Sequence, residues 1–194
     1  MGRPLRPFHA GIYHLGSHGS DDRHLFVDIE DRLTFLDRLV EVFERFSLRV
    51  ISYALLGNHY HGIVSTPGGR ISEALQQLHT SYSRRHNRRR GRSAHLFRAH
   101  GFGREIESDE DLLWTCRYVA HNPVEAGLAQ HPFTWPWSSA AATAGLSASL
   151  VPLDLAPIKA ALGDTPDWRR RYRELINGYD ATASSTRSGM SKFA

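Results

Sequence analysis

Two apolar, β-branched runs joined by a tight turn constrain the fold of this chain more than any other feature. They occupy residues 48–65, LRVISYALLGNHYHGIVS, with the turn-forming pair Gly57-Asn58 between them. Runs of this composition are typical of buried strands. Residues 48–65 are therefore predicted to form an antiparallel β-hairpin.

Further strands and helices are predicted on both sides of this hairpin. Residues 10–19 predict a first strand, and residues 31–46 predict a helix because their apolar side chains recur at helical spacing. A second helix is expected from Ser72, followed by a short strand at 101–107. Ser108 is expected to cap a third helix that ends near Asn122, because a proline follows.

The resulting order, β-α-β-β-α-β-α, begins with the six elements of a ferredoxin-like unit. The sequence therefore predicts an α+β fold, with a ferredoxin-like antiparallel sheet, helices on one face and a helical C-terminal extension. Residues 1–145 are expected to form the main domain and residues 146–194 the extension, with a helix at 167–177. Residues 180–194 are rich in Ser, Thr and Gly, and are predicted to be disordered.

Composition narrows the class of protein. The 194 residues include one cysteine, which excludes an intrachain disulfide and a cysteine-based zinc cluster. No apolar run reaches the length of a membrane span, and the N-terminus lacks the apolar core of a signal peptide, so a cytoplasmic location is expected. A formal charge of +4 permits binding to nucleic acid.

Two histidines stand one residue apart at the start of the second strand of the hairpin. His59 and His61 should point to the same face, because side chains alternate along a strand. They could bind one metal ion together. Taken alone, such a pair favours the alternative, two histidines on the solvated face of an antiparallel sheet.

A tyrosine and an asparagine share one face of the third predicted helix. Tyr118 and Asn122 are four residues apart, whereas Leu112, Cys116 and Val119 mark a different, apolar face. A tyrosine hydroxyl can act as a covalent nucleophile, and an amide oxygen can bind a hard cation. The alternative is a helical tyrosine that only packs its ring.

Together these motifs resemble a known family. The segments YHLGSHG, YALLGNHYHGIV, HLF, RYVAHNPVEAGL and WPWSS occur in the order found in the single-tyrosine HUH transposases. Within that family the chain is most similar to the REP-associated tyrosine transposase branch, over residues 5–145. It departs from the family pattern at Glu125, where a basic residue is common.

The resemblance implies a function and a set of site residues. It implies a transposase-like, single-stranded DNA endonuclease and strand transferase that acts near DNA hairpins through a 5′-phosphotyrosine intermediate. Tyr118 would be the catalytic nucleophile, and His59, His61 and Asn122 would bind Mg²⁺ or Mn²⁺. The expected partner is single-stranded or hairpin DNA, and the protein would act as a monomer or homodimer.

A run of arginines follows the second predicted helix. Six of the nine residues in RRHNRRRGR are arginine, and phosphate contacts by this run are expected. The alternative is a solvated helix end, where cations are favourable in any case. The residues assigned to DNA binding are Arg84, Arg85, Arg88, Arg89, Arg90 and Arg92.

Two other functions remain open from the sequence. The first is a non-catalytic, domesticated protein that binds a DNA sequence or hairpin on the same fold. The second is a protein in which the paired histidines hold a structural ion, whose removal would unfold the chain.

Overall fold

The computed structural model describes residues 8–93, 95–98 and 101–178. The tail predicted to be disordered, 180–194, lies outside the described residues. The strands and longer helices follow the predicted order: β1 (Gly11–His18), α1 (Ile29–Arg45), β2 (Arg49–Leu55), β3 (His59–Thr66), α2 (Ile71–Arg89), β4 (Phe102–Ile106) and α3 (Asp109–Glu125). Three shorter helices follow: α4 (Ala140–Thr143), α5 (Ala156–Ala161) and α6 (Trp168–Asn177).

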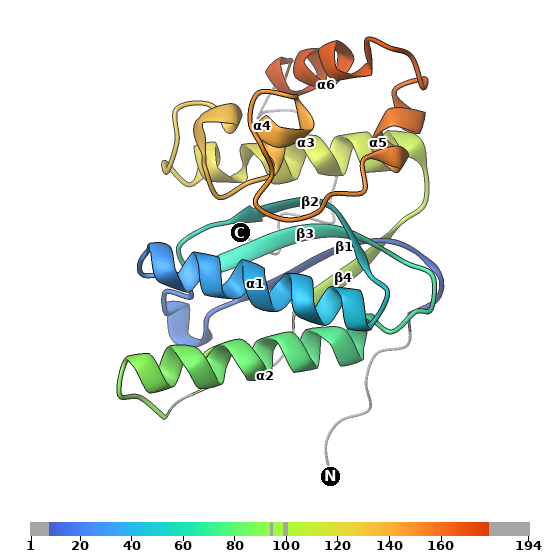
Figure 1. The fold of residues 1–194 in the computed structure, drawn as a ribbon. Helices are drawn as coiled ribbons and strands as arrows, with labels where there is room; N and C mark the ends of the chain where they lie inside the picture. Colours follow the sequence, from blue (N-terminus) through green and yellow to red (C-terminus); the bar gives the residue numbers. More distant parts are fainter. Residues whose placement is uncertain (1–7, 94, 99–100, 179–194) are drawn as a thin grey trace.

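The four strands form one antiparallel sheet in the order β2-β3-β1-β4, which confirms the predicted α+β class. The two helices of the ferredoxin-like unit, α1 and α2, cover one face (Figure 1). On the opposite face α3 packs against the sheet, α6 lies on the outer side of α3, and α4 and α5 lie beside α3. No helix among the described residues is both long and apolar enough to cross a membrane.

The C-terminal extension contributes to the apolar core around α3. Ile158, Trp168, Tyr172 and Ile176 are buried in the same cluster as residues of β2, β3 and α3. The imidazole of His121, on α3, also lies 2.8 Å from the carbonyl oxygen of Ile176. The division into a main domain and an extension at residue 145 stays a prediction. Helix α6 packs directly against α3, the helix that carries Tyr118.

The predicted end of the third helix at Asn122 is wrong. Helix α3 continues to Glu125 with Pro123 inside it. The helical hydrogen bonds of the backbone continue after the proline, since the N–H of Ala126 donates to the carbonyl of Asn122 (2.9 Å). Proline removes one N–H donor from the helix ladder. Its position in the last turn limits that cost, so the helix tolerates it.

The free edge of β2 is covered by the chain that follows α3. The backbone N–H of Leu55 donates to the carbonyl of Trp137 (2.9 Å), and the N–H of Ser139 donates to the carbonyl of Tyr53 (3.0 Å). Further along, the N–H of Asp154 donates to the carbonyl of Val50 (2.7 Å). This cover occupies groups that an exposed edge strand would otherwise offer to another chain.

Candidate functional site

The register of β1 against β3 brings four histidines to one face of the sheet. His59 lies opposite His18, and His61 lies opposite Gly16, two residues beyond His14. Directly opposed residues share a face, as do residues two apart. The face is the one covered by α3, because the rings of His14 and His61 lie 5.8 and 5.4 Å from the Tyr118 ring.

Gly16 leaves room for an aromatic ring beside these histidines. A Cβ atom at this position would stand 2.3 Å from the Phe102 ring and 2.7 Å from the carbonyl oxygen of Tyr60. Without it, the Phe102 ring packs 4.8 Å from His14 and 5.6 Å from His61, measured between centroids. The side of the histidine cluster formed by His14 and His61 is therefore packed closely against an apolar ring.

Each of the two predicted metal ligands has its Nδ1 atom engaged. His59 Nδ1 lies 2.8 Å from the amide oxygen of Asn58, which can only accept, so Nδ1 carries the proton and Nε2 keeps a lone pair. His61 Nδ1 lies 3.1 Å from Nε2 of His14. Nε2 of His61 is buried and has no hydrogen-bond partner among the described residues.

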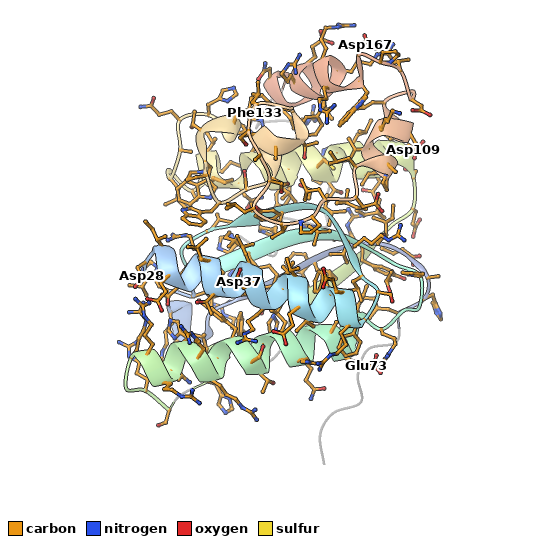
Figure 2. All side chains as sticks on the ribbon, in the orientation of Figure 1. Asp28, Asp37, Glu73, Asp109, Phe133 and Asp167 are labelled. Atoms are coloured by element: carbon orange, nitrogen blue, oxygen red, sulfur yellow. The ribbon has the colours of Figure 1, made fainter. Side chains whose placement is uncertain are left out.

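Helix α3 is anchored to the sheet by an ion pair at its N-terminal turn. The Ser108 hydroxyl caps the helix by accepting from the backbone N–H of Asp111 (3.2 Å). Arg104 of β4 donates to both carboxylate oxygens of Asp111 (2.6 and 2.9 Å) and to the Thr115 hydroxyl (2.9 Å). Figure 2 labels Asp109 at this end of α3. A bidentate contact of this kind fixes both the position and the rotation of the helix.

Tyr118 and Asn122 face the histidines from α3. The Tyr118 ring stacks on Trp114 (centroids 5.7 Å apart, planes at 4°), and the Asn122 amide nitrogen donates to the Tyr118 carbonyl oxygen (2.9 Å). Asn122 also lies close enough to His59, His61 and the Tyr118 hydroxyl to affect the pKa of each. The four residues predicted from separate parts of the sequence therefore meet at one point.

Burial sets the protonation states of this cluster. Desolvation, together with the neighbouring His18, lowers the pKa of His59 to about 4. Desolvation and the nearby imidazoles lower the pKa of His61 well below its usual value. Both rings are therefore neutral at pH 7, which is the form that binds metals.

The Tyr118 hydroxyl, in contrast, is not activated by the protein alone. Burial raises its pKa above the usual value; the Asn122 hydrogen bond opposes this rise, and the carboxylate of Glu125 adds to it. The phenol is therefore protonated at neutral pH. The carboxylate of Glu125 therefore acts electrostatically against the phenolate.

The donor set fits a divalent cation that takes few protein ligands. No three His, Cys, Asp or Glu side chains among the described residues are arranged to hold an ion. The buried, unpartnered Nε2 of His61 and the lone pair on Nε2 of His59 are nevertheless available. The Asn122 amide nitrogen donates to the Tyr118 carbonyl, so the amide oxygen is the atom that Asn122 could offer as a third ligand.

Sequence reasoning missed two members of the cluster, His14 and His18. His14 is buried, and desolvation followed by the charge of Arg104 lowers its pKa to about 3. His18 stacks on His59 with ring centroids 4.6 Å apart. Their even spacing along the first strand was an available signal, but its meaning depends on the register with β3.

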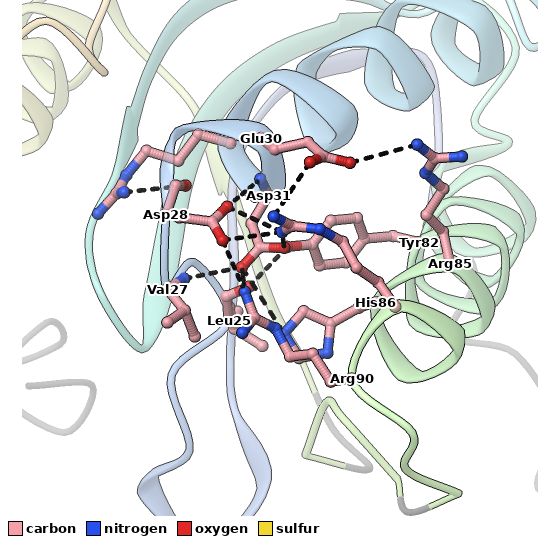
Figure 3. Close-up of polar contacts among 11 residues, drawn as sticks. Leu25, Val27, Asp28, Glu30, Asp31, Tyr82, Arg85, His86 and Arg90 are labelled. Carbon is pink, nitrogen blue, oxygen red and sulfur yellow. Dashed lines mark hydrogen bonds and ion pairs between the residues drawn. The ribbon is translucent and has the colours of Figure 1, made fainter.

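The structure divides the predicted basic run. Arg85, Arg89 and Arg90 form ion pairs with acidic residues at the start of α1 (Figure 3). We call this set, with its partners Asp28, Glu30 and Asp31, the α1–α2 clasp. Asp31 is 3% exposed and accepts from Arg89 (2.9 Å), from Arg90 (2.5 Å) and from the backbone N–H of Val27 (2.9 Å).

Arg84, Arg88 and Arg92 are exposed and are not part of the clasp among the described residues. They lie at the same end of the sheet as His59. The segment that begins at Leu25 connects the two places: the Leu25 carbonyl accepts from the Tyr82 hydroxyl of α2, and the Leu25 N–H donates to the carbonyl of Gly57. DNA contact by any arginine of the run stays a prediction.

The likeness to known proteins is structural. No protein-family model matches the chain, and no curated protein matches it. Among solved structures, the fold is similar to that of a REP-associated tyrosine transposase bound to a REP hairpin, with a TM-score of 0.61 and 16% sequence identity. The similarity covers 80% of this chain and 93% of that one. At this identity it establishes the fold.

Proposed function

We propose that the protein is a metal-dependent, single-stranded DNA endonuclease and strand transferase that cuts beside hairpins through a covalent link to Tyr118. One observation carries the proposal: the Tyr118 ring lies 5.4 Å from the His61 ring, and Asn122 lies close enough to the tyrosine hydroxyl and to both histidines of the pair to affect the pKa of all three. The likeness to a hairpin-bound tyrosine transposase supports the same substrate.

In this proposal Nε2 of His59, Nε2 of His61 and the amide oxygen of Asn122 hold the ion. A bound Mg²⁺ or Mn²⁺ would supply positive charge at the non-bridging oxygens of the scissile phosphate. Two imidazoles among three ligands favour Mn²⁺ on softness, since Mg²⁺ prefers oxygen.

Tyr118 performs the proposed chemistry. Its oxygen attacks phosphorus while the bond from phosphorus to the 3′-oxygen breaks, and the phenol proton is lost as the leaving 3′-oxygen gains one. The products are a 5′-phosphotyrosine and a free 3′-hydroxyl. Attack by another 3′-hydroxyl reverses the step and joins strands, so no nucleotide cofactor is needed.

The exposed arginines Arg84, Arg88 and Arg92 are proposed to contact the DNA backbone. Their positions near the His59 end of the sheet would let a bound strand pass from α2 to the tyrosine. Arg85, Arg89 and Arg90 are assigned mainly to the clasp, because their guanidinium groups already face carboxylates.

One observation favours a second candidate, a non-catalytic protein that binds hairpin DNA. The raised pKa of Tyr118 and the nearby carboxylate of Glu125 both disfavour the phenolate. In that case the protein would bind hairpins without ever forming a covalent adduct.

A labelled-strand experiment separates these candidates. The protein is incubated with Mn²⁺ and single-stranded hairpin substrates labelled at either end. Attack by Tyr118 should attach the 3′-labelled fragment to the protein and release the 5′-labelled fragment free. Tyr118→Phe should abolish the adduct but keep hairpin binding, whereas the control Tyr82→Phe, on the opposite face, should still form it. Undiminished cleavage by Tyr118→Phe would exclude it as the nucleophile, and binding without any adduct would favour the second candidate.

A further inference from the structure

We propose that His14 is a positioning residue of the candidate metal site, which holds His61 in the tautomer and orientation that can bind a cation. This inference rests on the proposed function, since it assigns a role to the same site. His14 lies on β1, 47 residues from His61 in sequence, and touches it through one hydrogen bond between ring nitrogens.

The contact allows two arrangements of one proton. Nε2 of His14 and Nδ1 of His61 lie 3.1 Å apart, so one of them donates and the other accepts. If Nε2 of His14 donates, a neutral His61 carries its own proton on Nε2 and cannot bind a metal. If Nδ1 of His61 donates, Nε2 of His61 is left with a lone pair. Cation binding therefore selects the second arrangement, in which His14 is the acceptor.

The place of Nε2 of His61 agrees with this assignment. The atom is buried and has no hydrogen-bond partner among the described residues, although a buried polar nitrogen normally has one. The His61 ring lies 5.4 Å from the Tyr118 ring and 5.1 Å from the His59 ring, between the proposed nucleophile and the other proposed ligand.

His14 is itself held rigidly. Its side chain is 2% exposed, and the edge-to-face contact with Phe102 (4.8 Å) fixes the ring from the β4 side. Asn58 has the corresponding contact with His59, since its amide oxygen lies against Nδ1 of that ring, but Asn58 lies in the half-exposed β2–β3 turn. Water can replace the Asn58 contact and cannot easily replace that of His14, so the loss of His14 should be the more damaging.

The test measures Mn²⁺ binding by isothermal titration calorimetry in the full chain without DNA. His14→Phe keeps an aromatic ring but removes the acceptor, and should weaken Mn²⁺ binding about 10- to 100-fold, the range found for outer-shell partners of metal-bound histidines. His14→Gln places an amide oxygen near the position of Nε2 and should restore most of the affinity. The control His79→Phe removes a half-buried imidazole that contacts Tyr60 on the opposite face (2.8 Å), and should bind like the wild type.

The outcomes separate this inference from the proposed function. Wild-type protein that binds no Mn²⁺, or His59→Ala that binds it as well as the wild type, would refute the metal site and the role of His14 with it. Equal affinity in wild type and His14→Phe would refute only the role of His14. If His14→Phe does not fold, nitrogen NMR of the wild type saturated with Mg²⁺ or Zn²⁺ tests the inference by showing which ring nitrogen of His61 carries the proton. His61 should be protonated at Nδ1, and protonation at Nε2 would overturn the inference.

Discussion

Asp31 is predicted to stabilise the protein through the α1–α2 clasp, and Asp31→Asn tests this. The substitution keeps the shape of the side chain but removes its charge. Breaking a buried ion pair on one side costs about 3–5 kcal/mol, because the remaining charge loses its partner. Arg89 and Arg90 remain partly exposed (34% and 21%) and keep Asp28 as a second partner. We therefore expect the lower end, a loss of about 3 kcal/mol in the free energy of unfolding.

Urea denaturation followed by circular dichroism at pH 7 measures this loss. The matched control is Asp37→Asn, further along α1 on its exposed side (Figure 2), which should change the free energy of unfolding by less than about 0.5 kcal/mol. Arg90→Met combined with Asp31→Asn should cost clearly less than the sum of the two single changes, because the residues share one interaction. A loss below about 1 kcal/mol for Asp31→Asn, or strict additivity with Arg90→Met, would refute the reasoning.

Four further predictions test the site and its support. Replacing Arg84, Arg88 and Arg92 together by Gln should reduce the slope of log K against log salt for single-stranded DNA by about 2, at about 0.7 per lost phosphate contact. Filter-binding or anisotropy titrations measure this slope. The control is Arg170 of α6, which forms ion pairs with Asp167 and Glu174, and Arg170→Gln should leave the slope unchanged. His59→Ala should abolish adduct formation on labelled hairpin DNA and leave the far-UV circular dichroism spectrum intact, because the ring lies on an already formed sheet. Burial lowers the pKa of His79 from 6.5 to about 4, so between these values the unfolded chain binds more protons and the protein becomes less stable as the pH drops. At about 1.4 kcal/mol per pH unit, the free energy of unfolding of His79→Phe should fall between pH 6.5 and pH 5 by roughly 2 kcal/mol less than that of the wild type, as measured by urea denaturation. Ile176→Ala should lower the free energy of unfolding by about 2–5 kcal/mol by opening a cavity between α6 and α3, and an effect below about 1 kcal/mol would show that the extension does not support that helix.

Local patterns in the sequence were enough to predict several parts of the site. The tight turn at Gly57-Asn58 and strand alternation placed His59 and His61 on one face, and helical spacing placed Tyr118 and Asn122 on another. The cap at Ser108 was also confirmed. These features depend on neighbours within a few residues, so periodicity and turn chemistry specify them.

The tertiary structure decided which of these local features meet, and with what partners. His14 and His18 joined the cluster because β1 pairs with β3 in one register, and a shift by one residue would have turned both away. Half of the arginine run formed the clasp with α1 because acidic residues more than fifty positions away lie beside it. The sequence contains all of these side chains, but hydrogen bonds and ion pairs act over a few ångströms, and only the folded chain determines which groups come that close.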